Sequence, residues 1–160
     1  MRHELYPNEW VPEHVWRQVK HSIAIPCVDI ILENLNREIL LGWRKIPPYS
    51  YVWATPGGRV LRGENLQDAA NRILREYGVN ADDLFLVGVF PIKFKTRADF
   101  TVCVASSKPS GVAIADGHEF SSFKWTSKLP SRTGANYVKM IRRWRVLRGN
   151  RPALWFNKIY

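Results

Sequence analysis

The 160-residue chain has only two cysteines, Cys27 and Cys103, and each lies inside an apolar, strand-like segment. Such isolated cysteines favour small buried side chains over a disulfide or a reactive thiol, and no Cys/His cluster with metal-ligand spacing is present. No segment approaches the ~20 apolar residues that a membrane-spanning helix needs. Residues 1–4 (MRHE) also lack an apolar signal segment. We therefore expect a soluble, cytoplasmic protein that does not bind membranes.

The chain also lacks acidic residues beyond Glu119. All 14 Asp and Glu lie in residues 1–119 with 14 of the 24 Lys and Arg, whereas residues 120–160 carry the other 10 basic residues. The C-terminal quarter thus contributes the whole formal net charge of +10. Positive potential of this kind attracts phosphates and nucleic acid. The basic helix and tail expected over residues 133–160 are therefore a candidate nucleic-acid surface, with a merely solvated helix face as the alternative.

Length and a hydrophobic content of 46% suit a single domain, which we expect to span residues 1–160. Apolar periodicity predicts helices over residues 12–22, 65–77 and 135–147. Apolar and β-branched runs predict strands over residues 24–34, 38–44, 51–54, 84–95 (one strand or two), 99–106 and 120–125. The first two strands are expected to form a hairpin around residues 35–37, and residues 107–116 to form a loop. Strands mixed with helices predict an α/β architecture.

The most informative segment is residues 56–78, PGGRVLRGENLQDAANRILREYG. Its apolar residues recur at the spacing of one buried helical face, namely Leu66, Ala69, Ala70, Ile73, Leu74 and Tyr77. Gly78 stands where a helix ends in a left-handed residue. Glu64, Asp68, Arg72 and Glu76 are four apart, so Arg72 can pair with carboxylates on both sides.

This loop and helix over residues 57–78 resemble the signature of the Nudix hydrolases, Gx5Ex7REUxEExGU, where U is a bulky aliphatic residue. Four residues match it in order and spacing, namely Gly58, Glu64, Arg72 and Leu74. Ile73 stands at the first helix glutamate, and the ending is one residue short, so Glu76 is the only carboxylate left of the usual cluster. The resemblance implies an α/β/α sandwich with a mixed β-sheet. Glu64 and Arg72 are expected to form an ion pair that fixes the loop onto the helix.

One branch of this family, the GDP-mannose mannosyl hydrolases, has a similarly weakened box, and the similarity to it extends over roughly residues 10–145. It includes IPCVDIILEN at 25–34, EILLGWR at 38–44, PGGRV at 56–60 and DFT at 99–101. The resemblance implies a hydrolase that uses Mg²⁺, or alternatively Mn²⁺. It implies cleavage of the sugar C1–O bond of a nucleotide sugar, GDP-mannose, to GDP and mannose with inversion. Most other Nudix enzymes cut phosphorus–oxygen bonds.

The same resemblance implies three substrate-binding residues. Arg44 and Arg59 match arginines that support the leaving group, and a guanidinium fork suits the oxygens of a diphosphate. Asp29, an acid inside an apolar strand, matches a substrate-binding acid, and a charge buried there needs a partner.

The resemblance also implies metal ligands and a base. Gly57, through its carbonyl, Glu76 and Glu119 match positions that hold the divalent cation, although Glu76 could instead only pair with Arg72. His118 becomes the general base if the loop before the last strand is shifted by two residues, and an imidazole titrates near neutrality. Without that shift Phe120 occupies the position of the base. A second histidine of the branch has no counterpart, because Ile92 and Lys93 occupy that stretch.

Two alternatives stay open. The first is a Nudix pyrophosphatase acting on another nucleoside diphosphate derivative, and the second is a degenerate module that binds nucleotide or RNA without turnover. The missing box glutamates favour the module, whereas Arg44, Arg59, Gly57 and Glu76 together favour an enzyme. The branch precedent is a homodimer, for which Trp10, Trp16 and Trp155 are candidate interface residues.

Overall fold

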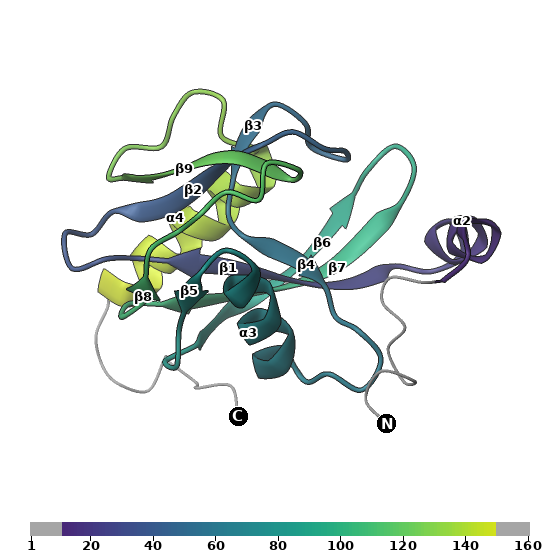
Figure 1. Cartoon of the computed structure of the whole chain (residues 1–160), viewed down its shortest axis with the longest axis horizontal. Helices are drawn as coiled ribbons and strands as arrows, with labels where there is room; N and C mark the ends of the chain where they lie inside the picture. Colours follow the sequence, from purple (N-terminus) through teal and green to yellow (C-terminus); the bar gives the residue numbers. More distant parts are fainter. Residues whose placement is uncertain (1–10, 150–160) are drawn as a thin grey trace.

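A four-stranded mixed sheet forms the centre of the computed structural model, which describes residues 11–149 (Figure 1). Its strand order is β4 (Gly57–Arg59), β1 (Ile25–Leu32), β7 (Ala98–Ser106) and β6 (Phe85–Lys93). β1 and β7 run parallel, whereas β1–β4 and β6–β7 are antiparallel. β1 and β7 are therefore the two inner strands of the sheet.

A second, antiparallel sheet has the order β3 (Val52–Ala54), β2 (Ile39–Arg44) and β9 (Phe120–Thr126). A two-stranded pair, β5 (Val79–Asn80) with β8 (Ser110–Gly111), extends the structure after the box helix. β8 falls inside the loop expected over residues 107–116, so that expectation was incomplete.

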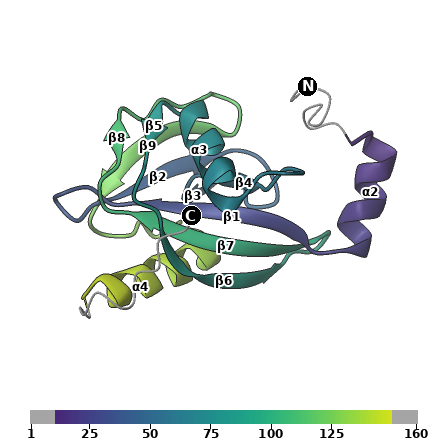
Figure 2. The ribbon, with the colours of Figure 1, turned by 90° about the horizontal axis from the view of Figure 1, so that it is seen from below.

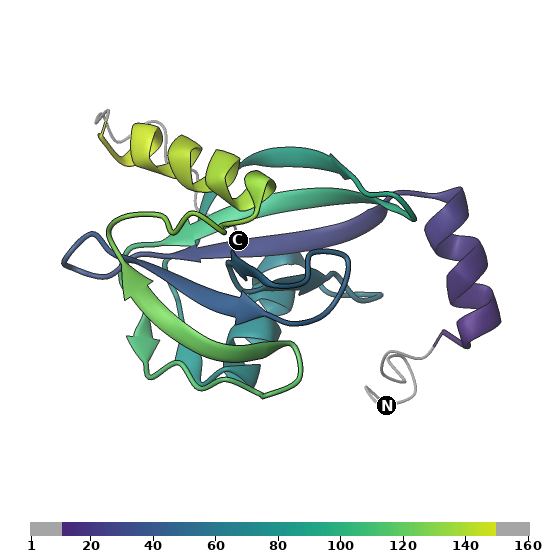
Figure 3. The same cartoon turned by 90° about the horizontal axis from the view of Figure 1, so that it is seen from above.

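Two helices cover opposite faces of the four-stranded sheet. α3 (Leu66–Glu76) lies on one face and α4 (Ala135–Gly149) on the other, as Figures 2 and 3 show. This arrangement confirms the predicted α/β/α sandwich. α2 (Glu13–Ser22) projects from the start of β1, away from the sandwich, and none of its residues is buried. Within residues 11–149, no helix is long and apolar enough to cross a membrane.

The box helix α3 forms where its apolar periodicity predicts it. Its cap is Asn65, whose side chain accepts a hydrogen bond from the Asp68 backbone N–H at 2.9 Å. Its buried residues face the core, namely Ala69, Ala70, Ile73 and Leu74. Gly78 follows with φ +72°, the left-handed conformation expected at the end of the helix.

The predicted hairpin of the first two strands is confirmed at its turn but not along the strands, which belong to different sheets. The turn itself forms, since Asn34 N–H donates to Glu38 O at 3.0 Å and Glu33 bridges Ile39. β1 and β2 then diverge into different sheets, where β1 pairs with β4 and β7 and β2 pairs with β3 and β9. The two cysteines are free and buried, as expected.

Most other expected elements agree with the structure to within a few residues, and residues 84–95 give one strand, β6. Trp10, Trp155 and the tail beyond Gly149 lie outside the described residues, so the interface and nucleic-acid expectations for them stay predictions.

Candidate active site

A cavity of about 270 Å³ opens over one face of the four-stranded sheet. Strand register explains its floor, because Cys27 lies opposite Arg59 and Thr101, and Asp29 lies opposite Gly57. Five of the seven residues expected at the site line this cavity, namely Asp29, Arg44, Gly57, Arg59 and Glu119. The fold therefore brings together segments that are far apart in the sequence.

Asp29 is the acid at the centre of the floor. Among the described residues none donates a hydrogen bond or forms an ion pair to its carboxylate. Burial raises the pKa of Asp29 to about 7, with Arg44 opposing the shift and the carboxylate of Asp99 reinforcing it. At neutral pH this side chain is therefore present in both its protonated and its charged form.

Arg44 forms an ion pair with Glu119 across the cavity. Its guanidinium also donates to the backbone carbonyls of Ile46 at 3.1 Å and Pro47 at 3.2 Å, which fixes its orientation. Burial raises the pKa of Glu119 above its ordinary value although Arg44 lowers it, and the nearby Asp116 and Glu76 raise it further. Arg44 and Glu119 are thus a prearranged pair of opposite charges at the wall.

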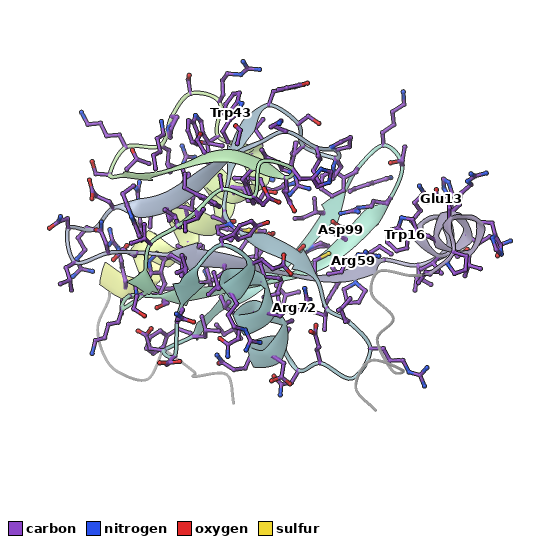
Figure 4. All side chains as sticks on the ribbon, in the orientation of Figure 1. Glu13, Trp16, Trp43, Arg59, Arg72 and Asp99 are labelled. Carbon is purple, nitrogen blue, oxygen red and sulfur yellow. The ribbon has the colours of Figure 1, made fainter. Side chains whose placement is uncertain are left out.

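Arg59 is held from the other side by the N-terminal helix. Its guanidinium carbon lies 4.6 Å from the ring centroid of Trp16, a cation–π geometry. Figure 4 shows Trp16 on α2 and Arg59 on β4 directed toward each other. α2 therefore contacts the site although it lies apart from the sandwich, and Trp16 is half-buried in this contact.

The Glu64–Arg72 pair joins the loop to α3. Arg72 Nε and Nη2 donate to the two carboxylate oxygens of Glu64 at 2.6 and 3.0 Å, and Nη2 also donates to the Arg59 carbonyl at 2.8 Å. Arg72 therefore fixes the backbone of the segment that carries Gly57 and Arg59, as a structural ion pair would.

The position of the missing box glutamate is apolar and closed. Ile73 is 2% exposed, and a β-carbon added to Gly58 would lie 3.2 Å from its Cδ1 atom. Among residues 11–149 there is no cluster of three or more His, Cys, Asp or Glu side chains arranged to hold a metal. The carboxylate of Glu76 adds to the raised pKa of Glu119, after the larger effects of burial and of Asp116, so these two carboxylates lie within electrostatic range of each other. Two carboxylates fit Mg²⁺, which commonly takes one or two from the protein and completes its shell with substrate phosphates and water.

Two of the expected residues do not line the cavity. Glu76 is 55% exposed at the end of α3, where it forms an ion pair with Arg72 at 3.5 Å. His118 is exposed in the loop before β9, where Asp116 accepts its backbone N–H at 3.1 Å. Phe120 is fully buried against Tyr77 and Phe123 and has no access to a ligand. Ile92 lines the cavity as an apolar wall residue.

Sequence reasoning missed a second set of lining residues, namely Tyr49, Phe94, Arg97, Asp99, Asn136 and Tyr137. They come from the loop after β2, the β6–β7 hairpin and the start of α4. Only Asp99 gave a signal, because an acid within an apolar strand is unusual and Asp29 was noticed for the same reason.

Comparisons with known proteins identify the family of the chain. A family model described as NUDIX domain matches residues 24–129. A Bacillus subtilis (strain 168) protein provisionally named an 8-oxo-dGTP diphosphatase is 40% identical over 100 residues, 61% of this chain and 63% of that protein. The low-salt glycan biosynthesis protein Agl8 of Haloferax volcanii is 29% identical over 85 residues, 52% of this chain and 54% of that protein. The chain thus spans less than two thirds of the length of these relatives.

The fold is also similar to solved structures. The MutT NUDIX hydrolase of Burkholderia pseudomallei superposes with a TM-score of 0.72 at 17% identity, covering 76% of this chain and 98% of that one. Because the family model matches more than half of the sequence and the fold agrees with it, the chain belongs to the NUDIX domain family.

Proposed function

We propose that this protein hydrolyses a nucleoside diphosphate sugar with the help of a divalent cation. GDP-mannose is the first candidate substrate, with GDP and mannose as the products. The observation that carries the proposal is that one cavity holds two arginines, Arg44 and Arg59, together with Asp29, a carboxyl whose pKa of about 7 suits proton transfer.

The two arginines would bind the diphosphate. Arg44 is oriented by Glu119 and two backbone carbonyls, and Arg59 by the ring of Trp16. Such fixed guanidinium groups stabilise the negative charge that develops on a leaving nucleoside diphosphate, because they need no reorganisation when the bond breaks.

Asp29 is the general base in this proposal. The oxygen of a water attacks C1 of the sugar, the C1–O bond breaks with its electron pair going to the phosphate oxygen of GDP, and Asp29 takes the water proton. We prefer Asp29 to His118 because Asp29 lines the cavity, whereas the imidazole of His118 is exposed outside it.

The cation would be held by Glu119 and the carbonyl of Gly57, which line the cavity, with Glu76 reaching it from outside the cavity at the end of α3. When bound, it supplies positive charge to the diphosphate. The sparse carboxylate set supports Mg²⁺ or Mn²⁺ taken up together with the substrate rather than a cation stored in the free protein.

The comparisons bear on the substrate without deciding it. The glycan biosynthesis relative supports a sugar-containing substrate, since glycans are built from activated sugars. The relative named as a diphosphatase supports the rival pyrophosphatase, which would cut between the phosphates. The buried Ile73 supports a binding module without turnover.

The decisive experiment is product analysis after incubation with GDP-mannose and Mg²⁺ in ¹⁸O-labelled water. GDP with mannose labelled at C1 is the expected result. Label in GDP instead of mannose would show attack at phosphorus, and GMP with mannose 1-phosphate would favour the pyrophosphatase. Parallel incubations with Mn²⁺ and with 8-oxo-dGTP test the alternative ion and substrate. No turnover of any substrate would refute the proposal and favour the module.

The base is tested with two variants under the same conditions. We expect Asp29→Asn to lower kcat about 100-fold or more, in the range found for loss of a general base. A larger loss with His118→Ala than with Asp29→Asn would return the role of base to His118.

A further inference from the structure

Two buried polar atoms at the cavity have no hydrogen-bond partner within residues 11–149. Asp99 is 6% exposed, and its Oδ1 atom is fully buried without a hydrogen bond to any described residue. Nε of Arg97 is in the same condition. Both side chains line the cavity, and neither is used by the hydrolysis described above. Unpaired buried polar groups are rare in folded proteins, so an unpaired acceptor next to an unpaired donor calls for a ligand.

The surrounding contacts hold both side chains in place. The Asp99 Oδ2 atom accepts from Arg97 Nη2 at 2.8 Å, and Asp99 lies between Ile25 and Ile92 in strand register. The Arg97 guanidinium carbon lies 5.6 Å from the ring centroid of Phe94, and the Arg97 carbonyl accepts the Phe94 N–H at 2.8 Å. The Cys27 thiol also neighbours the Asp99 carboxylate, but a thiol is a weak hydrogen-bond donor. Because Arg97 occupies Oδ2, Oδ1 is left as the acceptor for a ligand with a stronger donor.

The hydrogen-bonding groups of Arg97 and Asp99 restrict the chemical class of ligand that can bind them. A phosphate offers only acceptors and would be repelled by Asp99, and an ammonium group would leave the Arg97 Nε–H unpaired. A guanine edge would need both carboxylate oxygens for two parallel hydrogen bonds, and Oδ2 is taken. Neighbouring hydroxyl groups satisfy both atoms, since one donates to Oδ1 and the next accepts from Nε–H.

We infer that Arg97 and Asp99 form a subsite for a vicinal diol, beside Phe94 and Ile92, which contact or pair with them and also line the cavity. Resting on the proposed function, the inference specifies which part of a nucleoside diphosphate sugar is recognised. The diol belongs to the sugar or to the ribose of the nucleoside, because both groups carry one. The C–H face of either ring can pack on the apolar side chains beside the pair.

The test is calorimetric titration of the whole protein with three probes, GDP-mannose, GDP and 2′-deoxy-GDP, with and without Mg²⁺. The main variant is Asp99→Asn, in which an amide donor replaces the acceptor Oδ1. We expect about a tenfold loss of affinity for a ligand that places its diol at the subsite, the usual effect of losing a hydrogen bond to a charged group.

The three probes separate the two sources of the diol. If the sugar binds there, Asp99→Asn weakens GDP-mannose and leaves GDP unchanged. If the ribose binds there, the variant weakens GDP but not 2′-deoxy-GDP. Equal losses for all three probes, or no loss for any, would overturn the assignment. So would the absence of binding of every probe to the unchanged protein.

Two further variants guard against misfolding of Asp99→Asn and against effects that do not come from the cavity. Arg97→Lys retains the positive charge but removes Nε–H, and should reproduce the same ligand dependence if Asp99→Asn does not fold. Asp83→Asn is the matched control, because Asp83 pairs with Ser106 and Ser107 outside the cavity. Since binding is measured directly, failure of hydrolysis would refute the proposed function while a diol-dependent loss of affinity would still support the subsite.

Discussion

Oδ1 of Asp29 lies only 1.9 Å from the position that a β-carbon on Gly57 would occupy. The two residues are register partners across β1 and β4, so the missing side chain at position 57 leaves room for the carboxylate. Gly58, the next residue, packs on the other face of the sheet, where an added β-carbon would contact Ile73 of α3. The two adjacent glycines therefore accommodate the cavity on one side and the box helix on the other.

The substitution Gly57→Ala should displace the side chain of Asp29, the proposed general base. Because the new methyl group would overlap Asp29 and also meet the Val28 carbonyl at 3.0 Å, we expect a loss of about 100-fold in kcat/KM, the effect of a misplacement of about 1 Å. Gly58→Ala is the matched control, since Ile73 needs to shift by only a few tenths of an ångström. Steady-state kinetics and thermal melts of both variants check this, and equal kinetic losses would contradict it.

Asp29 should make stability fall as pH rises from about 4 to about 7. Its folded pKa of about 7 lies above the ordinary value of 3.8, so the folded state binds more protons than the unfolded state within this window. Each unit of pKa difference corresponds to about 1.4 kcal/mol. We expect Asp29→Asn to remove this slope and to be more stable than the unchanged protein at pH 8.

Urea unfolding at pH 5 and pH 8 measures the effect. Parallel pH dependence of the variant and the unchanged protein would show that Asp29 titrates normally in the folded state.

Substitutions at Glu64 and Glu76 should affect different properties, since Glu64 supports stability and Glu76 is proposed to support activity. Burial raises the pKa of Glu64, but the hydrogen bonds from Arg72 and the Leu61 N–H together lower it by more, so the net pKa is below its ordinary value. Glu64→Gln should therefore destabilise the protein by about 2 kcal/mol at neutral pH, with the difference shrinking in acid. Glu76 is exposed, and Glu76→Gln should change stability by less than about 1 kcal/mol.

Glu76→Gln should change the activity even though it hardly changes the stability. If Glu76 helps to hold the cation, Glu76→Gln raises the Mg²⁺ concentration needed for half-maximal turnover. An unchanged Mg²⁺ dependence would remove Glu76 from the metal site.

Glu33 should be the main anchor of α4. It is 1% exposed, accepts from Trp144 Nε1 at 3.0 Å and pairs with Arg148. Glu33→Ala should cost about 3 kcal/mol, because it leaves a partly buried arginine without its carboxylate. Arg37→Ala removes a side chain that is 61% exposed and should cost less than about 1 kcal/mol. Denaturant unfolding compares the two, and a small effect of Glu33→Ala would contradict the anchoring role.

The sequence predicts those parts of the fold that depend on neighbours along the chain. The amphipathic pattern of α3, its end at Gly78 and the Glu64–Arg72 pair all lie within one local segment, and all are confirmed in the structure. The pairing of β1 was mispredicted because strand partners are chosen across the molecule, and a tight turn after β1 does not make β2 its neighbour.

The candidate site follows the same division. Asp29, Arg44, Gly57 and Arg59 were expected from the resemblance to the mannosyl hydrolase branch, and the structure places them around one cavity. Their chemical roles stay predictions. Tyr137 reaches the cavity only because α4 folds back across the sheet, and no local pattern near it indicates a ligand.

The register of β1 has a consequence for how this domain tolerates change. Successive residues of a strand face opposite sides, and here Asp29 faces the cavity while Val28 and Ile30 are buried in the core. One residue inserted into or deleted from β1 ahead of Asp29 would exchange these two sets, presenting an aliphatic side chain to the substrate and a carboxylate to α3. Point substitutions along β1 alter the affinity or rate of this site by degrees, whereas a change of length by one residue would remove the acid from it altogether.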